Sequence, residues 1–176
     1  MLYQHDSSVH VNAYGHPLPL AWAGGFNNPQ FSMCDLNNDG KKDLVIFEAG
    51  SSVKTFINNG TAGNPDYRYA PEYAYNFPPV YNYLVMADYN CDGISDLFNR
   101  GGYGYSVYKG YYNWANQLCF TFYTDLFYDN DVTAGHSNAY VNPGDIPAIV
   151  DVDNDGDLDF ISYYIAGGTI YYYKNM

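Results

Sequence analysis

One nine-residue pattern constrains this chain more than any other feature of its sequence. Aspartate or asparagine stands at positions 1, 3, 5 and 9 and glycine at position 6, and the pattern occurs three times, as Asp35–Asp43, Asp88–Asp96 and Asp151–Asp159. Alternate side chains of a tight loop point inward, and glycine permits the sharp turn because it has no Cβ. Such a loop gathers oxygen atoms around one point, as a hard cation such as Ca²⁺ requires.

The sequence therefore predicts three calcium sites. A single cluster of this kind is as readily a polar turn, but three in one register, each followed by an apolar run, favour metal binding. The residue type at position 7 varies, as expected if only its backbone carbonyl is a ligand. The predicted ligands at positions 1, 3, 5, 7 and 9 are Asp35, Asn37, Asp39, Lys41 and Asp43; Asp88, Asn90, Asp92, Ile94 and Asp96; and Asp151, Asp153, Asp155, Asp157 and Asp159.

The helix–loop–helix calcium site is the main alternative, and the sequence argues against it. That loop ends in a bidentate glutamate at position 12, where this chain has Ile46, Asn99 and Ser162. The residues after each loop are β-branched and aromatic, which favours strands over helices. We therefore expect strand–loop–strand sites.

The charge of the chain is concentrated in these loops. They hold 11 of the 19 acidic residues, and the other 8 acids nearly balance the 7 lysines and arginines, within a formal net charge of −12. The acidity is thus mostly ligand charge, which repels itself when no metal is bound. No basic stripe is present, so we expect no nucleic-acid partner, and no run is long enough for a membrane span.

The strand pattern predicts a repeated all-β unit. A strand enters each acidic loop, one leaves it and one returns, as in Gln30–Cys34, Leu44–Glu48 and Val53–Ile57, and no segment has helical periodicity. We also expect strands at residues 8–14 and 119–123, and an irregular strand at residues 66–70 and 73–75 that Pro71 interrupts. The loops start 53 and 63 residues apart, the larger interval containing a polar insert at about residues 129–145. Periods of this size predict propeller blades of four antiparallel strands. We expect one domain over residues 1–176 with repeats at about 3–60, 61–112 and 113–176.

The loop followed by Leu or Phe, an apolar strand and a glycine turn resembles the FG-GAP/VCBS repeat. That resemblance implies a calcium-binding β-propeller like that of integrin α subunits, with ligands at the positions given above, in an extracellular or cell-surface protein. The asparagine-glycine turns and the many tyrosines are also similar to surface proteins of bacteria. Three blades of ordinary width cannot close a ring, so exposed strand edges remain. Either more chain exists, or copies associate edge to edge, in a closed assembly or a filament.

The residues do not predict an enzyme. Neither a nucleophile elbow nor a phosphate-binding loop is present, the four histidines lack zinc-site spacing, and the paired carboxylates are used as metal ligands. We expect adhesion or binding of a protein or carbohydrate ligand. The alternatives are a structural subunit of an extracellular filament, built from copies of itself, and, less favoured, the non-catalytic part of a larger enzyme.

Two residue types leave alternatives open. The chain contains 22 tyrosines, which suit both strand packing and an exposed aromatic binding surface. Cys34, Cys91 and Cys119 form an odd set without metal-site spacing, so one disulfide with a free thiol and three free thiols are both compatible with the sequence. The first residues lack the basic and apolar regions of a signal peptide, and a processed or truncated N-terminus would explain this equally well.

Overall fold

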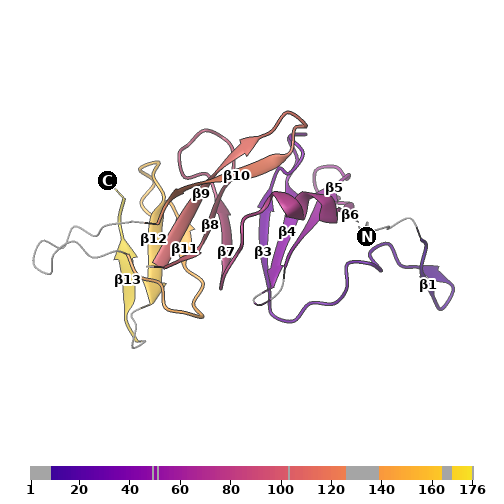
Figure 1. The fold of residues 1–176 in the computed structure, drawn as a ribbon, viewed down its shortest axis with the longest axis horizontal. Coiled ribbons are helices and arrows are strands. Elements are labelled where there is room, and N and C mark those ends of the chain that lie inside the picture. The colour runs from indigo at the N-terminus through magenta and orange to yellow at the C-terminus, as the bar shows by residue number, and fades with distance from the viewer. Residues whose placement is uncertain are drawn as a thin grey trace, which may run out of the picture.

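The structure is a computed structural model, and it describes residues 9–48, 50, 52–102, 104–125, 139–163 and 168–175. Three antiparallel sheets lie side by side along the longest axis, with β13 and the C-terminus at one end and the N-terminal strand β1 at the other (Figure 1). The expected all-β class is confirmed. The initial segment and the histidines at positions 5 and 136 lie outside the described residues.

Each sheet is a meander in which neighbours in sequence pair in space. The first sheet has the order β3-β4-β5-β6, the second β7-β8-β9-β10 and the third β11-β12-β13. The strands are β3 (Pro29–Cys34), β4 (Asp43–Glu48), β5 (Val53–Asn58), β6 (Tyr67–Tyr69), β7 (Leu84–Ala87), β8 (Asp96–Gly101), β9 (Gly104–Tyr112), β10 (Leu118–Thr124), β11 (Ala148–Val150), β12 (Asp159–Tyr163) and β13 (Ile170–Tyr173).

Two sheets have the four strands expected of a blade. The third has three among the described residues, and the sheets of the described chain do not close into a ring. Each sheet begins with the strand that enters an acidic loop. Strands β6 and β10, which the sequence analysis placed at the start of the second and third repeats, pair with the end of the preceding sheet.

Neighbouring sheets meet through their faces and their first strands: β3 contacts β7, and β7 contacts β11. Between the first and second sheets, the buried residues Val45, Phe47, Leu84 and Leu97 belong to one apolar cluster. Between the second and third sheets the core is aromatic, and the rings of Tyr105 and Phe160 pack with centroids 4.8 Å apart. Burial of this apolar surface is the main force that holds the sheets together.

Part of the expected insert also belongs to this aromatic core. Ala139 and Val141 are buried there, although residues 129–145 were expected to form a polar loop. Gly104 in β9 has a φ of +144°. A Cβ at that position would lie 2.4 Å from the carbonyl oxygen of Ala139, so glycine permits the close approach of the two backbones.

Two predicted strands differ in the structure. In the described part of the expected strand at residues 8–14, which starts at residue 9, only Asn12–Ala13 (β1) is paired, with His16–Pro17 (β2), in a hairpin turned by Tyr14 and Gly15, both with positive φ. The expected strand at residues 73–75 lies instead within a 3-10 helix, η1 (Pro71–Asn76). Pro71 has no N–H to give to a sheet, but its fixed φ suits the first turn of a helix.

Candidate metal centre

The three acidic loops adopt the same backbone conformation. Position 4 and position 6 both have positive φ in every loop: 59° at Asn38, 58° at Cys91 and 60° at Asn154, then 81° at Gly40, 86° at Gly93 and 99° at Gly156. Asparagine and glycine tolerate this left-handed region better than other residues. The second loop places a cysteine there, so its turn is held in spite of a less suitable residue.

The aspartate at position 1 organises the turn of each loop. In the first loop, the carboxylate of Asp35 accepts hydrogen bonds from the backbone N–H groups of Asp39 (3.1 Å) and Gly40 (2.7 Å). Asp88 accepts the equivalent bonds at 3.1 and 2.8 Å, and Asp151 accepts them at 3.2 and 3.1 Å. These bonds wrap the backbone around one carboxylate and fix its direction.

The side chains at positions 3 and 5 lie against each other. In the second loop, the amide nitrogen of Asn90 donates to the carboxylate of Asp92 at 2.8 Å. Asn37 and Asp39 make the same contact at 3.2 Å. The other oxygen of Asp39 and of Asp92 accepts the backbone N–H of position 7. Positions 1, 3 and 5 are therefore held on one turn by hydrogen bonds within the loop.

The aspartate at position 9 has a different role, because it forms hydrogen bonds to both its own loop and the sheet. Asp96 is fully buried, and its two oxygens accept the backbone N–H groups of Tyr89 (2.8 Å) and Gly110 (2.7 Å). Asp43 joins Leu36 and Asn58 in the same way. Asp159 accepts from Val152 and Asn175, and also from the hydroxyl of Tyr172 at 2.9 Å.

The sequence analysis missed the second backbone partners of these aspartates, which are Asn58 in β5, Gly110 in β9 and Asn175 just after β13. They lie 15, 14 and 16 residues after Asp43, Asp96 and Asp159. They act through the backbone, so their residue types carry no signal. The nearly constant spacing could have revealed them.

Burial makes two of these carboxylates unfavourable as anions. The pKa of Asp43 and the pKa of Asp96 are both raised, chiefly because burial desolvates the charge, although the two backbone hydrogen bonds of each lower the pKa. The position 1 and position 5 aspartates of the same loops also raise these pKa values. A cation in the loop would reverse this balance by favouring the charged form.

The third loop differs from the other two because position 3 is also an aspartate. Carboxylate oxygens of Asp151, Asp153 and Asp159 lie within 4.8 Å of one another, close enough to share one ion. The ammonium group of Lys174, just after β13, forms ion pairs with Asp153 and, at 3.1 Å, with Asp155. In the first two loops, the position 3 amide donates a hydrogen bond to the position 5 carboxylate. In the third loop, the ammonium group of Lys174 donates to that carboxylate instead.

The donor set fits a hard cation. The side chains at positions 1, 3, 5 and 9 all offer a carboxylate or amide oxygen as a metal ligand, and calcium prefers oxygen ligands. In the first loop, the side-chain oxygen of Asn37 is buried without a hydrogen-bond partner, and a buried acceptor of this kind is unfavourable until something binds it. At position 7 the structure shows hydrogen bonds only from the backbone N–H of Lys41, Ile94 and Asp157, not from their side chains.

The first two loops each contact the following sheet. The hydroxyl of Tyr112 in β9 donates to the backbone carbonyl of Asp35 at 3.0 Å. The exposed thiol of Cys91 in the second loop lies 3.6 Å from the carbonyl oxygen of Gly156 in the third. All three cysteines are free thiols, with Cys34 buried and Cys119 half-buried.

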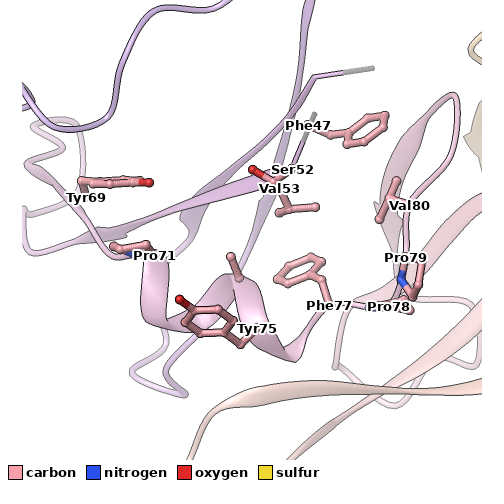
Figure 2. A pocket seen from close by; sticks show the side chains of 11 residues that line it. Phe47, Ser52, Val53, Tyr69, Pro71, Tyr75, Phe77, Pro78, Pro79 and Val80 are labelled. Atoms are coloured by element: carbon pink, nitrogen blue, oxygen red, sulfur yellow. The ribbon is translucent and has the colours of Figure 1, made fainter. Parts of the chain in front are cut away.

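A separate pocket of about 610 Å³ lies between η1 and the outer part of the first sheet. Phe47, Val53, Phe77 and Val80 point toward a common centre, and Tyr75 lies along its helical wall (Figure 2). The volume is within the usual range for small-ligand sites. The other lining residues are Ser52, Tyr69, Pro71, Ala74, Pro78 and Pro79, so the lining carries no formal charge.

Comparison with known families identifies the repeat. Residues 35–98, which include the first two acidic loops, match the model of a family described as the FG-GAP-like repeat. No curated protein and no solved structure matches the chain. Among the described residues, no helix is long and apolar enough to cross a membrane.

Proposed function

The chain contains an FG-GAP-like repeat, and from this premise we propose that it is a secreted or cell-surface calcium-binding module of the β-propeller type. Its role is adhesion or ligand binding, and it has no catalytic activity of its own. The observation that carries the proposal is the common geometry of the three loops, with positive φ at positions 4 and 6 and the same backbone bonds to the position 1 carboxylate.

Calcium would be held in each loop by the side chains at positions 1, 3, 5 and 9 and by the backbone carbonyl at position 7. Bound calcium neutralises the clustered carboxylates and favours the buried anions of Asp43 and Asp96. The position 9 aspartates then transmit the ordering of the loop to the sheet. Because the position 9 aspartate is bonded to both its loop and the third strand, anything that orders the loop also orders the sheet.

The test is calcium titration by calorimetry, together with thermal melts in calcium and in EDTA. Calcium stabilises the native state by RT ln(1 + [L]/Kd) if it does not bind the unfolded chain. We expect EDTA to lower the melting temperature strongly. A matched pair of variants locates the ligands: Asp153→Ala should abolish binding to the third loop, whereas Asp157→Ala should preserve it because only the backbone of position 7 is used. An unchanged melt in EDTA would overturn the proposal.

The pocket beside η1 is the candidate site for a carbohydrate ligand. Tyr75 is 85% exposed, and its ring is available to stack against the apolar face of a sugar, while the hydroxyl of Ser52 in the lining can donate or accept a hydrogen bond. An uncharged lining suits a neutral saccharide better than an acidic one. The aromatic character and the volume of the pocket support this assignment.

A glycan array probed in millimolar calcium tests the pocket. We expect binding of neutral glycans that Tyr75→Ala weakens at least tenfold. Tyr14→Ala is the control, because Tyr14 is a fully exposed tyrosine on the hairpin, away from the pocket. Equal loss in both variants, or no neutral glycan bound, would exclude the pocket as the site.

A further inference from the structure

The described chain forms the same sheet-to-sheet contact twice. The second residue after each acidic loop faces the following sheet: Val45 packs in the cluster between the first and second sheets, and the ring of Phe98 lies 5.9 Å from that of Phe160 in the third sheet. The first residue after the loop faces the preceding sheet, as Leu97 and Phe160 do. The two faces of a blade are therefore distinct, and each has a fixed partner.

At the end of the row, the third sheet repeats the forward-facing pattern, and no other sheet of the described residues packs against it. Ile161 stands where Val45 and Phe98 stand, and Tyr163 is its neighbour on the same face. Their cross-strand partners are Tyr172 and Ile170, so all four side chains share one face. Tyr163 is 52% exposed and Ile170 61% exposed. We call this surface, which also includes Val150, the tail face.

The apolar equivalents in the first two sheets are covered, whereas the counterpart of Tyr163 in the second sheet is the half-buried Arg100. Val45 and Phe98 are fully buried, and Phe47, the counterpart of Tyr163, is 1% exposed. Val150 is paired with the position 9 aspartate of its loop, as Cys34 is in the first sheet. Cys34 is fully buried, whereas Val150 is 48% exposed. Among the described residues no sheet follows the tail face, and its exposed apolar residues stand at positions that are buried in the first sheet.

At the other end of the row, the first sheet presents the complementary half of this contact. Phe31 and Met33 of β3 pair with Ile46 and Leu44 and are 63% and 50% exposed. Their counterparts in β7 pack against the preceding sheet. We call Phe31 and Met33 the head face.

The counterparts of the head face are Leu84 and Met86, which occupy the same register against β8. Leu84 is 2% exposed and lies in the cluster between the first two sheets, and Met86 packs against that cluster. Ala23 packs on Ile46 and Phe56 of the first sheet, so the β4 and β5 part of that surface is covered. The β3 part remains exposed, and first strands are where neighbouring sheets of this chain meet.

We propose that the tail face of one copy binds the head face of a second copy, by the contact that already joins the sheets within each chain. The occupant is a second copy because the two exposed halves belong to one interface that this sequence forms internally twice. The contact is head-to-tail, so it leaves a free head and a free tail at the ends and builds an open chain unless the rotation closes. This goes beyond the proposed binding function and does not depend on the pocket.

Sedimentation velocity of the full chain in millimolar calcium tests the proposal with two blocking variants. Tyr163→Glu places a charge on the tail face, and Phe31→Glu places one on the head face. We expect the unmodified chain to form oligomers that grow with concentration and each variant to be monomeric. An equimolar mixture of the two variants should form a dimer, because one intact head and one intact tail remain. Tyr75→Glu is the control, since Tyr75 is exposed but lies on neither face.

Each result decides the matter. A monomeric unmodified chain at all concentrations would overturn the proposal, as would a mixture of the two variants that stays monomeric. Oligomers that persist in both variants would also overturn it and would point to pairing of strand edges. Both substituted side chains are exposed, and a melting temperature within a few degrees of the unmodified chain verifies that each variant is folded.

Discussion

The buried aspartate at position 9 and the exposed aspartate at position 5 should have separable effects on stability. Asp96 is fully buried and accepts two backbone hydrogen bonds, at 2.8 and 2.7 Å. Asn at this position keeps one acceptor oxygen and turns an NH₂ group toward the second backbone N–H. One charge-assisted bond of about 1.5–3 kcal/mol is lost, and two buried donor groups, the backbone N–H and the new NH₂, face each other unpaired.

The net cost should be smaller than the sum of those two terms. Burial raises the pKa of Asp96, so the neutral amide avoids part of the cost of burying a charge. We expect Asp96→Asn to lower the free energy of unfolding by about 2–3 kcal/mol. In a domain of this size that corresponds to a fall of about 4–12 °C in melting temperature.

Asp92 provides the matched comparison. Its exposed carboxylate accepts the N–H of Ile94 and the side-chain amide of Asn90, each at 2.8 Å. Asparagine preserves the acceptor for Ile94, and water can replace the exposed bond to Asn90. Asp92→Asn should therefore change the free energy of unfolding by less than about 0.5 kcal/mol without metal. With calcium, loss of a charged ligand that weakens binding about tenfold removes about 1.4 kcal/mol of the stabilisation.

The assay is denaturant unfolding of both variants in EDTA and in calcium. The reasoning requires Asp96→Asn to be destabilised in both conditions and Asp92→Asn only in calcium. Equal destabilisation of the two variants in EDTA would refute the separate role given to position 9. If Asp92→Asn matched the unmodified chain in calcium, position 5 would not be a ligand.

The other predictions concern the pH dependence of stability, the reactivity of the thiols and the ion pairs of Lys174. Burial raises the pKa of Asp43 and of Asp96, so their contribution to stability is present at low pH and is lost as the pH rises through the raised pKa values. Through these two groups the melting temperature in EDTA should fall as the pH rises, and calcium should weaken or reverse that fall. The exposed thiol of Cys91 should react with Ellman's reagent in the native protein, whereas Cys34, whose pKa burial raises to about 12, should react only after unfolding; rapid native modification of Cys34 would contradict its burial. Lys174→Met removes the cation that pairs with the third loop, so calcium affinity there should rise about two- to fivefold by calorimetry, and an unchanged or weaker affinity would contradict the competition.

The sequence by itself determined the loops, the strands beside them and the all-β class. These features are local: a turn with alternating acidic side chains needs glycine at its centre, and β-branched and aromatic runs favour extended backbone. The strand after each loop was predicted to within a residue at its start, at Asp43, Asp96 and Asp159. Calcium binding, the extracellular location, the role in adhesion or ligand binding and the absence of catalysis stay predictions.

The tertiary structure decided the features that depend on distant segments. The pairing of β6 and β10 with the preceding sheets, the ties from Asp96 to Gly110 and from Tyr112 to Asp35, and the burial of Val141 all join residues far apart in sequence. Backbone groups make many of these contacts, and backbone groups are the same in every residue. An aromatic side chain at the same position after the loop is buried at Phe47 and exposed at Tyr163. Burial depends on what packs against the sheet, and residue type alone does not specify that neighbour.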